Sequence, residues 1–183
     1  MEKKYEFTGE TQAWEHGTVT LRRIRALVDI PDVGVKQGDL GGWIQVERNL
    51  SQSGKAWIHD NSKVWGLAQV NDDAQVSDNA CVFGNATICG NARVSSYAQV
   101  FDYACLRDSA VAACHAKVHD HACLYGCAQV MDADIRGQAV IRDQARICPH
   151  SRIGGYNKTV IKGYYTCEGE TLESGTYSSE KPY

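Results

Sequence analysis

A six-residue repeat runs through more than half of this 183-residue chain, from Ile58 to Ile153. Each unit begins with an aliphatic residue and has a small residue four places later, and one residue is missing between Val130 and Ile135. The aliphatic series is Ile58, Val64, Val70, Val76, Val82, Ile88, Val94, Val100, Leu106, Ala112, Val118, Leu124, Val130, Ile135, Ile141, Ile147 and Ile153. Among the residues that stand four places after each aliphatic residue, Asp134, beside the missing residue, is the one that is not small. A fixed period of this kind decides the architecture of a chain.

The third position of each unit is Asp or Gly in most units, as at Asp60, Gly66 and Asp72. Both residues favour tight turns, because they tolerate positive φ or bond their own backbone. The spacing of apolar residues fits no helix. Residues 57–155 contain ten Asp and no Glu, which favours corners over helices. We predict an all-β triangular solenoid with 18 residues per coil, in about five to six coils.

The repeat resembles the hexapeptide-repeat family over about one hundred residues and seventeen units. That resemblance implies a left-handed parallel β-helix. The runs "YEFTGET", "RRIRAL", "GDLGGWI", "NLSQSG" and "AWIHDNSKVWG" are similar to a group of uncharacterised hexapeptide-repeat proteins of enteric bacteria and their phages. This narrower resemblance implies a cytoplasmic, often phage-borne protein, and it supplies no catalytic residues.

The sequence divides into three parts. Residues 1–56 do not follow the repeat and are predicted to form a β-rich N-terminal cap, with one or two strands over 18–30, since solenoids need protected ends. Residues 57–155 form the prism. Residues 156–183 are expected to form a C-terminal cap, with a last strand or hairpin over 160–166 and a polar tail that is mobile or bound by a partner.

Composition argues against several classes of function. The net charge is −3 without a basic stripe, which argues against binding nucleic acid. There is no leader-like segment and no long apolar run, so we expect a cytoplasmic protein with no membrane contact. Eight cysteines without a C-x-x-C pair are expected to be reduced thiols. Cys105 and Cys123 are eighteen residues apart and should stack on neighbouring coils, which leaves a disulfide or a metal pair as the alternative.

One outward column is the main candidate site. It contains Trp65, Phe83, Phe101 and His119 at intervals of eighteen, and then Arg136 after the deletion. Three large aromatic residues in register on an outer face predict an interface, either in a homo-oligomer (dimer or trimer) or with another protein. The alternative is that the head or the tail of the chain folds back over this column and buries it.

Two enzymatic alternatives exist among hexapeptide-repeat proteins. Acyltransferases of this class use a His as general base, and the candidates here are His115, His119, His121 and His150. The uninterrupted repeat and the lack of a C-terminal helix argue against this activity. Zinc carbonic anhydrases use three His, but His115 and His119 bracket one strand and lie roughly 13 Å apart. We therefore predict a non-enzymatic recognition protein, with no catalytic residue, cofactor or metal, that is a candidate phage-borne inhibitor of a host factor or defence system.

Overall fold

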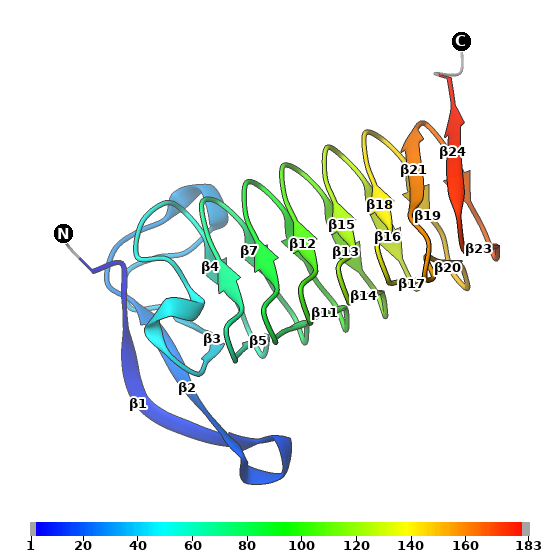
Figure 1. Cartoon of the computed structure of the whole chain (residues 1–183). Helices are drawn as coiled ribbons and strands as arrows, with labels where there is room; N and C mark the ends of the chain where they lie inside the picture. Colours follow the sequence, from blue (N-terminus) through cyan, green and yellow to red (C-terminus); the bar gives the residue numbers. More distant parts are fainter. Residues whose placement is uncertain (1–2, 181–183) are drawn as a thin grey trace.

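The computed structural model describes residues 3–180 and confirms the all-β solenoid (Figure 1). The chain winds so that every third short strand joins the same parallel sheet, and three sheets enclose the prism. Helical structure in the described residues is limited to three short 3-10 turns, η1 (Glu15–Gly17), η2 (Pro31–Val33) and η3 (Glu47–Asn49). No helix in residues 3–180 has both the length and the apolar character needed to cross a membrane.

The three sheets are called sheets 1, 2 and 3 below. Sheet 1 contains β1 (Tyr5–Trp14), β2 (Val19–Ala26), β3 (Leu40–Ile44), β5 (Lys63–Val64), β8 (Cys81–Val82), β11 (Gln99–Val100), β14 (Lys117–Val118), β17 (Asp134–Ile135), β20 (Arg152–Ile153) and β23 (Thr171–Leu172). Sheet 2 contains β4 (Trp57–Ile58), β7 (Gln75–Val76), β10 (Arg93–Val94), β13 (Val111–Ala113), β16 (Gln129–Met131), β19 (Arg146–Ile147) and β22 (Thr166–Cys167). Sheet 3 contains β6 (Gln69–Val70), β9 (Thr87–Ile88), β12 (Cys105–Leu106), β15 (Cys123–Leu124), β18 (Val140–Ile141), β21 (Thr159–Gly163) and β24 (Gly175–Ser179).

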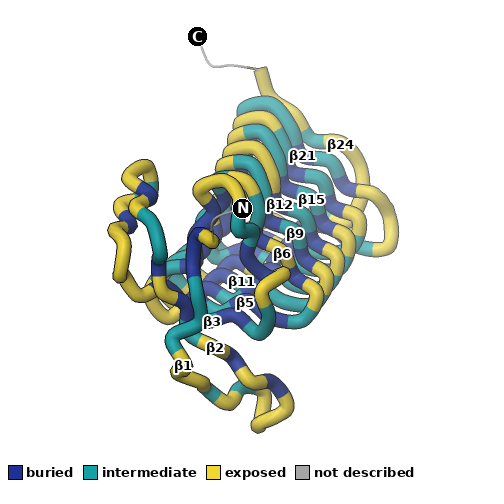
Figure 2. Tube along the Cα trace, turned by 90° about the vertical axis from the view of Figure 1, so that its left-hand side faces the viewer, coloured by how far each residue is buried: buried dark blue, intermediate teal, exposed yellow. Residues whose placement is uncertain are grey.

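The core consists of the aliphatic residues that begin the units, together with the alanines of the corners. Both groups are buried along the whole repeat, from Ile58 to Ile153, and in Figure 2 the buried positions of successive coils lie in line along the prism. In-register pairing places each aliphatic residue on its counterpart one coil away, as Leu106 on Leu124. The core is therefore a stack of thin layers, each with one aliphatic side chain from each sheet.

The corner residues explain why the repeat uses Asp. Asp72, Asp78 and Asp108 all have positive φ. Their carboxylates accept a hydrogen bond from the backbone N–H of the corresponding residue one coil later: the distances are 3.0 Å for Asp72–Gly90, 2.7 Å for Asp78–Ser96 and 3.0 Å for Asp108–Gly126. A Glu side chain is one carbon longer and less suited to this short reach. Asp thus both forms the turn and ties neighbouring coils together.

The corner shifts by one residue in the last two units. Their third positions are Pro149 and Gly155, but the residues with positive φ are His150 and Gly154. The proline ring holds φ near −65°, so Pro149 cannot occupy the left-handed position and its neighbour takes it.

The missing residue is absorbed at the corner before β17. Ala133 is buried there, and its carbonyl accepts the hydrogen bond from the Lys117 N–H at 2.8 Å. Asp134 moves to the first strand position, where its side chain points outward. Its misfit in the small series therefore results from the one-residue shift.

The solenoid is longer than predicted. Eight strands of sheet 1, from β3 to β23, stack in parallel, which gives about eight coils in place of five to six. In its described residues the C-terminal segment adds coils: β21 supplies the strand predicted in this region, and it forms no hairpin because it pairs in parallel with β24. A segment without the strict repeat can still form a coil, because its backbone groups hydrogen-bond to the unpaired backbone groups of the preceding coil. Residues 181–183 of the predicted tail, and residues 1–2 of the predicted cap, lie outside the described part.

The head extends sheet 1. β1 and β2 form an antiparallel hairpin, β2 pairs antiparallel with β3, and β3 pairs in parallel with β5. β2 realises the strand predicted within residues 18–30. The Gly-Gly pair of β3 is required by close packing: a Cβ on Gly41 would lie 2.6 Å from Ile24 Cγ1, and one on Gly42 would lie 2.6 Å from the carbonyl oxygen of Ser62.

Candidate functional site

Four rings of the predicted column form a continuous stack on the outer face of sheet 1. Each of Trp65, Phe83, Phe101 and His119 directly follows the inward residue of a strand in that sheet. The ring centroids of successive pairs are 4.5, 4.9 and 4.8 Å apart, and the interplanar angles are 6°, 2° and 2°. These separations match the spacing of neighbouring strands, roughly 4.8 Å, so the solenoid itself sets the stacking distance. We call these four residues the aromatic ladder.

The N-terminal hairpin covers the first ring of the ladder. Trp14 packs edge-on against Trp65 at 6.1 Å, and the Trp65 indole N–H donates to Glu15 Oε1 at 3.1 Å. Val19 and Leu21 complete a small apolar cluster around Trp65, which is only 6% exposed. Phe83 packs against this cluster but stays half-buried, and Phe101, outside the cluster, is half-buried as well. The chain's own head thus covers one end of the ladder, and the other end keeps partly exposed rings.

Arg136 does not extend the ring stack. It follows β17 in the same sheet, and its Nε donates to the carbonyl oxygen of Gly154 at 3.2 Å. The guanidinium is thereby tied to the next coil.

His119 ends the ladder between two carboxylates. Its Nε2 lies 2.8 Å from Asp134 Oδ1, and its Nδ1 lies 3.5 Å from Asp120 Oδ1. The hydrogen bond from the Gly137 amide, together with His119, lowers the pKa of Asp120. The ladder therefore ends in a polar ring that has a carboxylate beside each of its two nitrogens.

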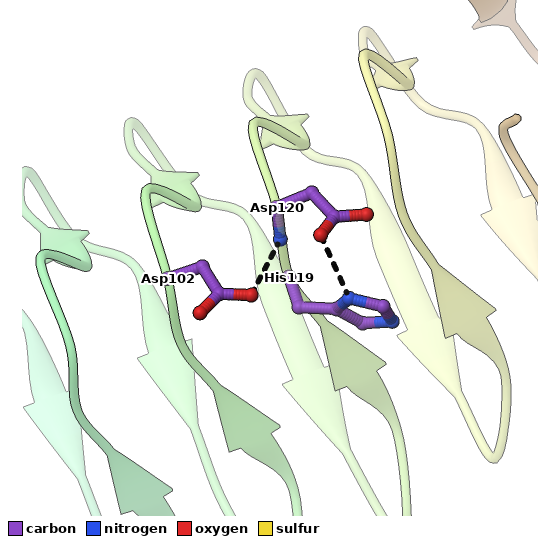
Figure 3. Close-up of side chains that lie close together, drawn as sticks. All are labelled: Asp102, His119 and Asp120. Carbon is purple, nitrogen blue, oxygen red and sulfur yellow. Dashed lines mark hydrogen bonds and ion pairs between the residues drawn. The ribbon is translucent and has the colours of Figure 1, made fainter. Parts of the chain in front are cut away.

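Figure 3 shows His119 with Asp102 and Asp120, whose donor atoms lie within 4.8 Å of one another. Such a trio has the ligand types of a transition-metal site. Asp102, however, accepts the Asp120 N–H at 3.3 Å, and Asp120 accepts the Gly137 N–H at 2.8 Å. These are the corner hydrogen bonds found throughout the prism, so the repeat accounts for the arrangement of both carboxylates.

A second polar site lies near the deletion. His115 Nδ1 is 3.1 Å from Asp132 Oδ1, and the hydrogen bond from the His115 backbone N–H lowers the pKa of Asp132. The His115 side chain is 75% exposed. It borders a groove of about 470 Å³ that is lined by His115, Lys117, Asp132, Ala133, Asp134, His150, Ser151, Arg152 and Thr171. The structure thus brings His115 and His150 to one groove, whereas His121 does not line it.

The sequence alone did not identify Asp132 and Asp134 as the partners of His115 and His119. The coil that contains the deletion has 17 residues, so strand partners beyond it stand 17 and not 18 residues apart, as Lys117 and Asp134 do. Counting from the deletion would have placed Asp134 beside Lys117, on the face that carries His119. No sequence pattern indicated that Trp14 and Glu15 would contact Trp65, because the hairpin lies outside the repeat.

The solenoid with its 18-residue coils fits a hexapeptide-repeat family. No protein-family model matches the chain. One curated relative is the uncharacterized acetyltransferase YdcK of Escherichia coli strain K12, which is 38% identical over 80 residues. The aligned segment covers 40% of this chain and 24% of the relative, so the similarity spans about a quarter of that protein's length.

Proposed function

We propose that this protein acts by recognition and that the uncovered part of the aromatic ladder is its binding surface. The observation that supports this most directly is the position of Phe83 and Phe101: two stacked, half-buried rings on the outside of a prism, where polar side chains are expected. Aromatic residues in such positions dominate the energy of protein interfaces. The rings are held in place by the backbone of the coils, so binding would cost little conformational entropy.

The first partner we propose is a second copy of the chain, in a dimer or a trimer. The surroundings of the ladder suit a protein contact, since Lys117 and Asp134 give it a polar border next to an apolar centre. The resemblance to proteins carried by phages of enteric bacteria also suggests a finer role, the inhibition of a host factor or defence system in the cytoplasm. This role would use the same surface against a host protein.

Replacing both Phe83 and Phe101 by Asp is expected to convert the oligomer to a monomer, because two charges would enter the centre of the interface. Light scattering of the wild type and the variant gives the masses, and circular dichroism checks folding. The matched control replaces Asn71 and Tyr125 by Asp, at the same strand position in sheet 3, and should keep the oligomer. A monomeric wild type, or a folded double variant of unchanged mass, would contradict self-association through the ladder.

A second candidate function is acyl transfer from acyl-coenzyme A to an amine or hydroxyl group. It is favoured by the His115–Asp132 pair, because Asp132 would orient the imidazole through Nδ1 and leave Nε2 to take the acceptor's proton. The groove also carries Lys117 and Arg152, which suit an anionic substrate. The name of the curated relative lends weak support.

Calorimetric titration with acetyl-coenzyme A distinguishes the two functions. If the protein acts only by recognition, no binding in the micromolar range is expected. Micromolar binding, together with acetylation of an amine acceptor that His115→Gln reduces at least about a hundredfold, would establish the second candidate. His121→Gln is the matched control, because His121 lies outside the groove.

A further inference from the structure

Three of the eight cysteines gather on the outer face of sheet 3, on the strands β9, β12 and β15 and their ends. Cys105 begins β12 and Cys123 begins β15, and the two are in-register neighbours in adjacent parallel strands. Cys89 directly follows β9 and stands two positions further along its strand. Cys105 and Cys123 are therefore the closest pair in register, on a different face from the aromatic ladder.

The positions of these two residues allow a direct bond between their sulfur atoms. Each precedes an inward leucine, Leu106 or Leu124, so both side chains point outward from the same face. Neighbouring parallel strands lie roughly 4.8 Å apart, inside the range of about 4.4–6.8 Å between the Cα atoms of disulfide-bonded cysteines. All eight cysteines are free thiols in this structure, and both members of the pair are half-buried.

The surroundings favour one thiolate within the pair. The interaction between the two thiols lowers the pKa of Cys123. The same interaction, together with burial, raises the pKa of Cys105, and the Arg107 guanidinium acts to lower both. Arg107 is held in place over the ring of Tyr125, with 4.5 Å from its Cζ to the ring centroid. One member of the pair is thus disposed to be the thiolate, and the other remains the thiol.

We propose that Cys105 and Cys123 form a reversible oxidation site that reacts with hydroperoxides. The Cys123 thiolate attacks the peroxide O–O bond and takes one oxygen, which gives a sulfenic acid and releases water or an alcohol. The Cys105 sulfur then attacks the sulfenic sulfur, forms the S–S bond and expels the oxygen as water. In total, the two thiols lose two protons and two electrons, and one peroxide is reduced by two electrons. The product disulfide joins neighbouring coils of sheet 3, and a dithiol reductant restores the two thiols.

The test treats the reduced full chain with hydrogen peroxide, alkylates the remaining thiols and maps tryptic peptides by mass spectrometry. A Cys127→Ser background is used, since Cys127 would otherwise share a peptide with Cys123. The expected product is a cross-link between peptides 94–107 and 118–136 that reduction removes. In Cys105→Ser, Cys123 should stop at a sulfenic acid that dimedone traps. In Cys123→Ser, oxidation at Cys105 should be at least about tenfold slower, as expected when a low-pKa thiolate is lost.

Cys89→Ser is the matched control, because it removes a cysteine of the same face and should leave the cross-link unchanged. A cross-link from Cys105 to Cys89, equal oxidation rates in both single variants, or oxidation of Cys114 and Cys148 before the pair would each overturn the proposal. Circular dichroism of every variant confirms that the coils are intact. The serine variants are nearly isosteric and lie on the outer face, so they should fold.

Discussion

Replacing Leu106 by Ala is expected to lower the free energy of unfolding by about 2–5 kcal/mol. Leu106 is fully buried and lies in register between Ile88 and Leu124 on the neighbouring strands. In many cores, side chains above and below a cavity move to fill it. Here, backbone hydrogen bonds between coils hold the layers at the strand spacing, so the layers cannot collapse. We therefore expect a loss in the upper part of this range.

Urea unfolding followed by circular dichroism measures the change, with the m-value checking that the transition keeps its cooperativity. The matched control is Leu67→Ala, since Leu67 stands at a corner and is 52% exposed. Its effect should stay within about 0.5 kcal/mol. Similar losses in the two variants would show that the layered core does not carry the stability we assign to it.

Replacing Trp65 by Ala is expected to cost about 3–5 kcal/mol and to release the N-terminal hairpin from the prism. The indole stacks on Phe83, packs against Trp14 and donates a hydrogen bond to Glu15, so it joins the hairpin to the first coils. In the variant, Val19 and Leu21 lose the ring that covers them. The coils beyond β8 have their own layers and should stay folded, as in other repeat proteins whose units contact only their neighbours.

Limited trypsin digestion tests this release, because Arg22, Arg23 and Arg25 lie in β2 of the hairpin. Cleavage there should be faster in the variant, while the prism survives as a resistant fragment. Phe101→Ala is the control: Phe101 belongs to the same ladder but not to the apolar cluster around Trp65. A hairpin equally resistant in wild type and Trp65→Ala would mean that β2–β3 pairing and the packing of Tyr5 and Ile24 in the main core hold it.

Most of the prism could be predicted because its period expresses a local rule. An aliphatic residue, a small corner residue and a turn residue specify the same short strand and corner wherever they recur, as from Ile58 to Val130. The prediction failed where that rule was disturbed. At Pro149 the left-handed position passes to His150, and the C-terminal coils have too irregular a sequence to show the period.

The candidate site was predictable only in part. The register of Trp65, Phe83, Phe101 and His119 followed from the 18-residue coil, and the structure stacks all four rings. The burial of Trp65 by the N-terminal hairpin could not be derived from the sequence, because the hairpin that carries Trp14 shares no period with the prism. The proposals that Phe83 and Phe101 form an interface, and that the chain binds a partner, remain to be tested by the experiments above.

The sequence by itself determined the solenoid, its inward and outward positions and the columns that run along its faces, because each of these depends on contacts at a constant interval. Only the tertiary structure decided how the head folds onto sheet 1, which part of the ladder it leaves uncovered, and which carboxylates reach His115 and His119. These features depend on contacts between segments with no common period and on a one-residue shift in register. Their geometry is set by the packing of the whole chain, which no local pattern of residues encodes.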